Sequence, residues 1–197
     1  MNTPAHLAAS LLLWRNEPGW RGALAVAFGA FLPDLPMFGF YIFQKMIGST
    51  ERQIWSTLYF EPHWQTLFDI FNSIPLALIA VVVCIGIRQP LGVLVAASAI
   101  LHMLCDLPVH NDDAHRHLWP IDWRFASPVS YWDPDHFGFI FAPLELLFAA
   151  AASWFVAFRG AHKPMRVLGR INLVLYAIVL LTIAAFLWRF IARQMFQ

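Results

Sequence analysis

The sequence is poor in charge. Charged residues make up 13% of its 197 residues and hydrophobic residues 59%, whereas a soluble domain is usually about 25% charged and about 45–50% apolar. The net charge is +1, and the chain has no basic block, no glycine-rich phosphate loop and no zinc-ribbon spacing. These absences argue against a nucleic-acid partner and favour a protein of the lipid bilayer.

Cysteine is also scarce. Cys84 and Cys105 both lie in apolar runs, which is typical of small buried hydrophobic residues and gives no disulfide framework. The N-terminus lacks the basic region of a cleavable signal peptide. From the length we expect a single integral-membrane domain over residues 1–197.

Long apolar runs are what the sequence does have. A membrane-spanning helix needs about 20 apolar residues. Runs near that length cover 66–87, 138–158 and 171–189, and a shorter one covers 91–107. A tight turn makes 66–107 a helical hairpin, and 138–189 forms a second hairpin. We therefore predict an all-α fold, a polytopic membrane helical bundle with about four long transmembrane helices.

The first 47 residues are less regular. A short helix begins near Thr3, which can cap it, and Pro4 suits its first position. A second apolar segment is interrupted by Pro33 and Pro36, which disrupt helix continuation. Neither segment crosses ~30 Å of hydrocarbon alone. Two interpretations remain: a broken or re-entrant N-terminal helical pair over 1–47, or one long span kinked at Pro33.

Residues 108–137 form a longer segment outside the apolar runs, rich in Pro, Asp, His and Trp. Its aromatic residues suit the headgroup level of a membrane. The short basic loop 159–170 is expected in the cytoplasm by the positive-inside rule. The His/Asp-rich loop then faces outward.

Ionisable residues within the apolar segments are the strongest functional signal, because they are costly in a membrane and mark functional sites. They are Asp34, Asp69, His102, Asp106 and Glu145, joined by the amide of Asn72. The hairpin arrangement brings most of them, and His6, to one end of the bundle. Asp69 and Asn72 are three apart and so share one helix face.

His102 and Asp106 are four residues apart, so both project from one helix face. They can hold a metal ion between them, or form an ordinary hydrogen bond or ion pair, or Asp106 can orient a histidine as an outer partner. More ligand-type side chains follow just past the helix end: His110, Asp112, Asp113, His115 and His117. Divalent metals such as zinc take nitrogen and oxygen ligands from such sets.

The order of these elements resembles a known family. An early His6, "LPD" with Asp34, "FNSIP" with Asn72, and "LHMLCD" followed by "HLWPI" resemble the bacterial membrane-bound metal-dependent hydrolases, the YdjM-like family that includes a LexA-regulated inner-membrane hydrolase. The resemblance covers roughly residues 1–125. The helical ligands resemble, more distantly, the zinc-dependent phospholipase C type of metal site. Asn72 stands where the family pattern has His, and Asn is a weaker ligand.

The resemblance implies a hydrolase of the bacterial inner (cytoplasmic) membrane. It would act on a phosphoester or lipid-linked substrate at the membrane interface, in contact with membrane lipid. A divalent metal, with zinc as the expected ion, would be held by His6, Asp34, His102, Asp106 and His110. The general base would be Asp112, Asp113 or Glu145, and supporting residues would be Asp69, Asn72 and His115.

A second hypothesis is a non-enzymatic small membrane transporter or assembly partner with a buried polar network, because intramembrane carboxylates and histidines also mark ion pathways. Clustering discriminates between the two hypotheses. The metal ligands of a hydrolase should converge at one membrane interface, whereas the polar groups of an ion pathway should be distributed across the bilayer. Glu145 fits either.

Overall fold

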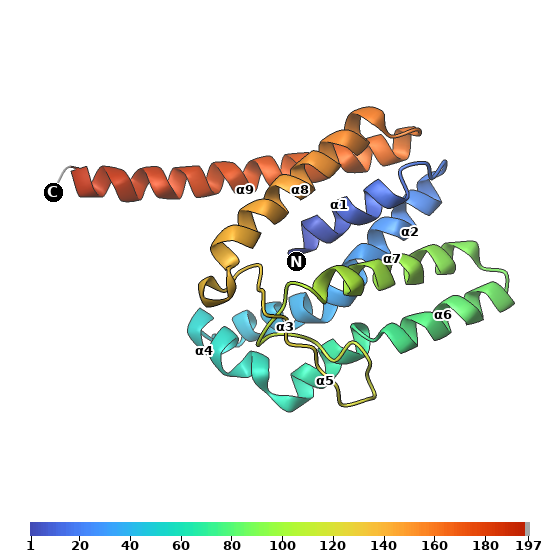
Figure 1. The fold of residues 1–197 in the computed structure, drawn as a ribbon, viewed down its shortest axis with the longest axis horizontal. Helices are drawn as coiled ribbons and strands as arrows, with labels where there is room; N and C mark the ends of the chain where they lie inside the picture. Colours follow the sequence, from blue (N-terminus) through green and yellow to red (C-terminus); the bar gives the residue numbers. More distant parts are fainter. Residues whose placement is uncertain (196–197) are drawn as a thin grey trace.

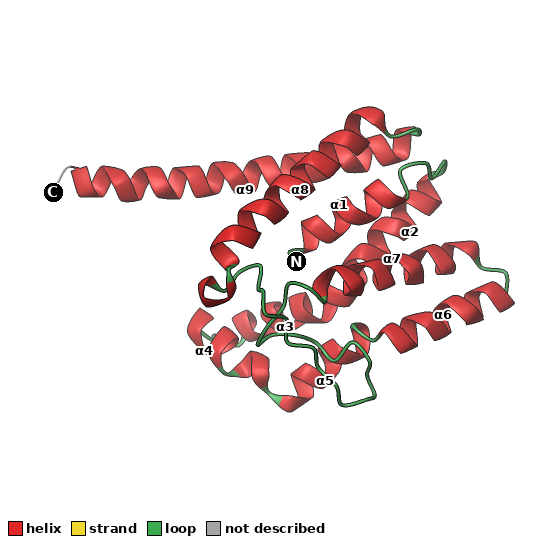
Figure 2. Cartoon of the chain, in the orientation of Figure 1, coloured by secondary structure: helices red, strands yellow, loops and turns green. Residues whose placement is uncertain are grey.

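Every regular element in residues 1–195, the part of the chain that this computed structural model describes, is a helix (Figure 2). Side chains are described up to Leu181, apart from Val179. The α-helices are α1 (Thr3–Leu13), α2 (Trp20–Phe31), α3 (Leu35–Met46), α4 (Glu51–Ser56), α5 (Pro62–Phe71), α6 (Ile74–Gly86), α7 (Pro90–Asp106), α8 (Gly138–Arg159) and α9 (Lys163–Met195). Single 3₁₀ turns are η1 (Leu32–Asp34), η2 (Leu58–Phe60) and η3 (Pro134–His136). The all-α prediction is confirmed.

Three helical stretches in the described residues are long and apolar enough to cross a membrane: Trp20–Met46, Pro62–Gly86 and Gly138–Arg159. The run expected at 91–107 corresponds to α7, which is apolar but has only 17 residues. The span expected at 171–189 lies within α9, and its outer part falls outside the residues whose side chains are described. Among the described residues three stretches therefore meet the requirement, and the expected count of four is not confirmed.

The N-terminal region follows the second of the two sequence interpretations. α2 passes through η1 directly into α3, so the two prolines interrupt the helix by one 3₁₀ turn and do not end it. Pro36 lies in the first turn of α3, where a helix does not use the backbone N–H that proline lacks. The re-entrant pair is thus wrong for the second segment, and a long span kinked at Pro33 is what forms. The cap of α1 also differs, because Asn2 and not Thr3 accepts from the N–H of Ala5.

The apolar run 66–87 is divided into two helices. α5 ends at Phe71, and the Ser73 side chain caps α6 by accepting from the N–H of Leu76 at 3.2 Å. Asn72 therefore ends one helix and does not share a helix face with Asp69 as expected. The segment between α3 and α5 contains the short helix α4.

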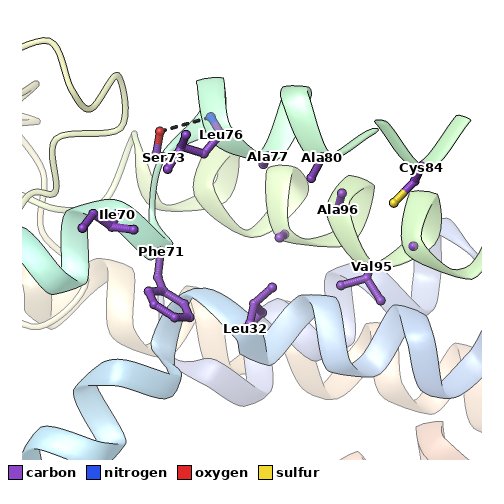
Figure 3. Close-up of a pocket in the computed structure, with 12 residues that line it drawn as sticks. Leu32, Ile70, Phe71, Ser73, Leu76, Ala77, Ala80, Cys84, Val95 and Ala96 are labelled. Carbon is purple, nitrogen blue, oxygen red and sulfur yellow. Dashed lines mark hydrogen bonds between the residues drawn. The ribbon is translucent and has the colours of Figure 1, made fainter. Parts of the chain in front are cut away.

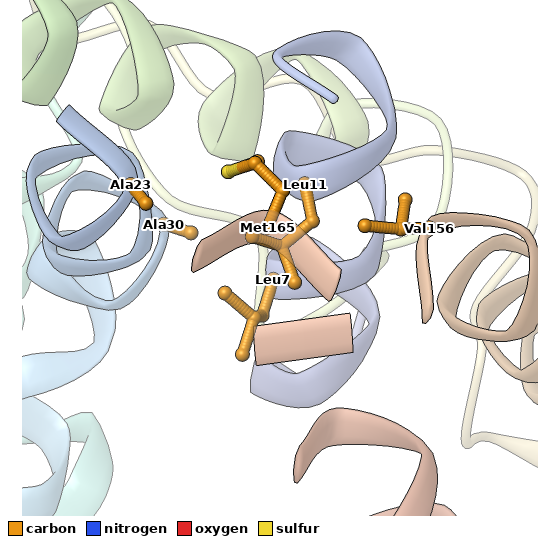
Figure 4. Close-up of a cluster of buried hydrophobic side chains, with 6 residues drawn as sticks. All are labelled: Leu7, Leu11, Ala23, Ala30, Val156 and Met165. Carbon is orange, nitrogen blue, oxygen red and sulfur yellow. The ribbon is translucent and has the colours of Figure 1, made fainter. Parts of the chain in front are cut away.

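Helices α1, α2, α8 and α9 meet in a common core. In Figure 4 the side chains of this core point toward one another; they are Leu7, Leu11, Ala23, Ala30, Val156 and Met165. α8 and α9 form the predicted second hairpin, and α6 and α7 lie side by side on the other flank (Figure 1). The loop that follows α7 crosses back over the end of the bundle near the start of α1 (Figure 1). This end carries the polar residues discussed below.

α2 and α7 approach each other closely at Gly29. A Cβ atom at this position would lie 2.2 Å from the carbonyl oxygen of Val95 and 2.7 Å from Cβ of Ser98. The close contact lets the Ser98 hydroxyl donate to the carbonyl of Val26 at 2.7 Å. The same hydroxyl lies 2.9 Å from the Ser10 hydroxyl of α1. Hydrogen bonds across small residues are a usual way to join helices in a membrane, where no hydrophobic force brings them together.

An apolar groove of about 420 Å³ lies between α6, α7 and η1. Figure 3 shows that its lining is almost entirely hydrocarbon, with Leu32, Ala80 and Val95 among the residues drawn. The one hydroxyl that it contains, from Ser73, is used to cap α6 and to donate to the carbonyl of Trp119. The groove therefore offers no chemistry of its own.

The contact at Gly29 gives a first prediction. Gly29→Ala forces α2 and α7 apart, and we expect it to lower the free energy of unfolding by about 1–3 kcal/mol, the usual cost of overpacking. Gly39→Ala on α3 is the matched control, because a Cβ there meets nothing within 4 Å. Thermal unfolding of both variants in detergent tests this; equal melting temperatures for the two would contradict it.

Candidate metal centre

The N-terminal turn of α1 meets the C-terminal end of α7 through a buried group of three ligand-type side chains: His6, His102 and Asp106. The rings of His6 and His102 stack with their centroids 3.5 Å apart and their planes 12° apart. One carboxylate oxygen of Asp106 lies 2.9 Å from Nε2 of His6, and the other lies 3.1 Å from Nε2 of His102. The expectation that His6 lies within ligand reach of the α7 pair is confirmed.

The orientation of His102 is fixed from α2. Its Nδ1–H donates to the carbonyl oxygen of Ala30 at 2.8 Å, so its Nε2 faces the carboxylate of Asp106 at 3.1 Å. A backbone carbonyl that holds one imidazole nitrogen while the other faces a ligand group is the usual outer arrangement of a metal-binding histidine. The close approach at Gly29 is what brings this carbonyl within reach.

Asp34 extends this group from η1. Its Oδ1 lies 3.5 Å from Nε2 of His102, and its Oδ2 accepts from the Thr3 hydroxyl at 2.5 Å. We call His6, Asp34, His102 and Asp106 the His/Asp cluster. Two imidazoles and two carboxylates from three separate segments converge here, and ligand atoms of His6, His102 and Asp106 lie within 4.8 Å of one another. This spacing could hold one divalent ion.

His110 lies beside the cluster and connects it to Asp113. Its Nε2 is 3.1 Å from Asp106 Oδ1, and its Nδ1 is 2.9 Å from Asp113 Oδ2. Burial disfavours the imidazolium, but the charge and hydrogen bond of Asp106 and the hydrogen bond of Asp113 together outweigh this effect and raise the pKa of His110 to about 9. His110 is therefore held as an ion-pair partner between two carboxylates, and it lies outside the three-residue group that could bind a metal.

Asp113 is the better placed of the two neighbouring aspartates. Burial favours its neutral form, but contact with His110 and the indole N–H of Trp132 lowers its pKa. Its second oxygen is buried without a partner. Asp112, which the sequence also suggested as a base, is exposed and does not line the cavity beside the cluster.

Asp69 belongs to a separate polar group. The side chain of Arg116 contacts Asp69 Oδ2 at 2.5 Å, and the backbone N–H of Arg116 donates to Oδ1 at 2.8 Å. His115 lies nearby, with Nδ1 3.7 Å from Asp69 Oδ1. Asp69 therefore does not join the His/Asp cluster, contrary to the expectation that all these groups meet; it fixes the loop after α7 to α5.

Asn72 and Glu145 also have structural partners. The Asn72 amide donates to the carbonyls of Pro33 and Phe68 and thereby ties α5 to the kink in the first long helix. Its oxygen stays unpaired and buried. Glu145, from α8, accepts from the backbone and side-chain N–H groups of Asn2. It fixes the start of α1 and does not line the cavity.

The loop after α7 is folded tightly over the site. The Ser127 hydroxyl donates to the carbonyl of Pro108 at 2.7 Å, and the N–H of Tyr131 donates to the carbonyl of Val109 at 3.0 Å. His115 and His117 are buried beneath this loop and are not surface residues. Burial lowers the pKa of His117 to about 4, with a further effect from His115. The neutral ring donates from Nδ1 to the carbonyl of Asn72.

A cavity of about 620 Å³ adjoins the His/Asp cluster. Asp34, Asp106, His110 and Asp113 are among the residues that line it. The sequence did not point to Thr3, which holds Asp34, or to Tyr131, whose ring lies 5.1 Å from that of His110. Thr3 was expected as a helix cap and Tyr131 as a headgroup anchor. These are the commoner roles of such residues, and nothing in the sequence indicated their contacts with Asp34 and His110.

Compared with known protein families, curated proteins and solved structures, the chain has no match. What the site can do therefore has to be argued from its own geometry.

The partners of Asp69 give a second prediction. Asp69→Asn keeps an oxygen for the N–H of Arg116 but removes the charge that faces its guanidinium. We expect lower thermal stability and unchanged metal content, because Asp69 lies outside the cluster. Metal analysis beside a thermal melt separates the two effects. Loss of bound metal with no change in melting temperature would instead make Asp69 a ligand.

Proposed function

We propose that the protein is a membrane-embedded metal-dependent hydrolase that acts on a phosphoester or lipid-linked substrate at the membrane interface. The observation that carries the proposal is the buried group of His6, His102 and Asp106, in which His102 is oriented from behind so that its Nε2 faces the carboxylates of Asp106 and Asp34. Imidazoles and carboxylates that converge in this way are the ligands that divalent metals such as zinc take.

The donor set suits zinc. Two imidazoles and one carboxylate, with a further position open, form a common catalytic zinc arrangement. Asp34 is positioned to contribute a fourth ligand or to hold His102. When bound, a divalent ion polarises a phosphoryl or acyl oxygen and activates water.

The chain's own residues would hold and move the proton. Asp113 would act as the general base, because it lines the cavity and its Oδ2 contacts His110. His110 would position Asp106 and Asp113 relative to each other through its two ring nitrogens. Trp132 would fix Asp113 by its indole N–H. Asp112 and Glu145 have no part in this scheme.

The arrangement of the polar groups supports a hydrolase over a transporter. The His/Asp cluster gathers at one end of α7, and the Asp69–Arg116 pair lies beneath the same loop. At about 1.5 Å per residue, α2 is ~18 Å long and α7 is ~25 Å long. The far ends of these helices therefore lie well away from the cluster. The site would thus lie near one membrane face and would not form a path across the bilayer.

We further propose a bacterial inner-membrane location in which α7 and α9 cross the membrane together with the three long apolar stretches, and the loop after α7 faces outward. Cysteine accessibility tests this topology in a variant that lacks Cys84 and Cys105. Labels at Asn111→Cys and Lys163→Cys should react from opposite sides of the membrane in sealed vesicles. Reaction from the same side would overturn the arrangement.

The metal assignment gives a direct prediction. His102→Ala and Asp106→Asn should lose bound metal and hydrolysis of a phosphoester and lipid-ester panel, while the helical content remains because packing rests on the apolar faces. His162→Ala, in the turn between α8 and α9, is the control and should keep both. Changing an outer partner, as in Thr3→Val, should weaken metal affinity by a milder ~10–100-fold.

The contradicting result is equally clear. Wild-type protein that retains no metal under any supplementation and hydrolyses nothing would overturn the proposal. The His/Asp cluster would then be a buried hydrogen-bond network of a membrane scaffold or transport protein.

A further inference from the structure

The cavity beside the His/Asp cluster has two chemically different kinds of lining. Besides the carboxylates it is lined by a set of aromatic side chains from one stretch of the chain, here called the aromatic wall: Phe38, Trp55, Tyr59, Phe60 and Phe68. They come from α3, α4, η2 and α5. Ligand cavities of roughly 300–1,000 Å³ enclose one drug-sized molecule, and this cavity of about 620 Å³ falls within that range. A molecule that fills it would have one apolar and one polar end.

The exposure of the aromatic wall shows where the cavity opens. Phe68 is 1% exposed and Tyr59 6%, whereas Phe38 is 41% exposed and Trp55 and Phe60 are each 43% exposed. Phe68 and Tyr59 thus form the deep part and the other three form the rim. Exposed aromatic side chains are typical of the level where hydrocarbon meets headgroups. An amphiphile could therefore enter from the membrane without passing through water.

The lining carries more negative than positive charge. Three carboxylates line the cavity, from Asp34, Asp106 and Asp113, and no Lys or Arg is among the described lining residues. The nearest arginines are engaged elsewhere: Arg116 with Asp69, and Arg124 with Gln65. Two cationic groups that line the cavity, the amino group of Met1 and the imidazole of His110, are already paired with Asp106 and Asp113 and leave the lining net negative. Like charges in a partly buried site repel strongly, so these carboxylates oppose an anionic ligand.

We propose that this cavity binds a single-chain amphiphile with a phosphate at its polar end, and that the phosphate can enter only when a divalent ion is bound to the His/Asp cluster. The hydrocarbon chain lies against the aromatic wall. The choice of phosphate rests on the proposed function, whereas the chain-binding wall and the order of binding come from the lining itself. The bound ion replaces the cationic side chains that phosphate sites usually supply.

The test uses the full-length protein in lipid nanodiscs with two photoreactive probes. Both carry a diazirine at the end of the same alkyl chain; one ends in a phosphate and the other in an uncharged glucoside. Crosslinked peptides are mapped by mass spectrometry, with and without zinc, and bound metal is measured in the same samples. We expect zinc-dependent labelling of residues 37–68 by the phosphate probe, and zinc-independent labelling there by the glucoside.

Two variants on one helix provide a matched comparison. Phe38 lines the cavity, whereas Phe43 does not and is similarly exposed, at 48%. Phe38→Ser should weaken labelling of the aromatic wall by both probes roughly tenfold, because apolar contact is lost, with bound metal unchanged. Phe43→Ser should label like the wild type.

The possible failures can be told apart. If the protein binds metal but Phe38→Ser labels like the wild type, this inference is overturned and the proposed function stands. Equal labelling by the phosphate probe with and without zinc overturns the order of binding. Labelling of the aromatic wall in protein that never retains metal overturns the proposed function along with the order of binding, but not the chain-binding wall.

Discussion

The carboxylate of Asp106 is the group on which the rest of the site depends. It is buried at the end of α7 and contacts His6 from α1, His102 from its own helix and His110 from the following loop. A carboxylate removed from water costs several kcal/mol unless charged or hydrogen-bonding groups surround it. These contacts therefore hold three segments of the chain in one place. They also leave each imidazole with a fixed orientation.

This polar centre requires unusually close helices. Gly29 lets the backbone of α2 approach α7, and the carbonyl of Ala30 then reaches Nδ1 of His102. A little further along, the Ser98 hydroxyl of α7 donates to the carbonyl of Val26 in α2 and contacts the hydroxyl of Ser10 in α1. Apolar packing within a bilayer does not by itself select one register. Small residues and buried hydrogen bonds therefore determine which ligand groups meet.

The sequence allowed part of this arrangement to be predicted. His102 and Asp106 share a face because helical periodicity is a local property, and His6 was placed correctly because it starts a helix at the same end. The position of Asp69 was predicted wrongly, because its partner Arg116 lies 47 residues away in the sequence and no local pattern indicates that ion pair. The break at Pro33 was overestimated, because a single 3₁₀ turn accommodates it. Asp112 and Asp113 are neighbours in sequence, and only the fold of the loop shows which one faces the cavity.

The central claim is that His6, His102 and Asp106 bind one metal ion. X-ray absorption at the zinc edge of the purified, zinc-loaded protein tests it most directly. The account predicts nitrogen and oxygen ligands at about 2.0–2.1 Å with the outer scattering of two imidazoles, reduced to one imidazole in His102→Ala if that variant still retains any zinc. A sulfur ligand at about 2.3 Å, as Cys105 would give, or a spectrum without imidazole scattering would contradict it.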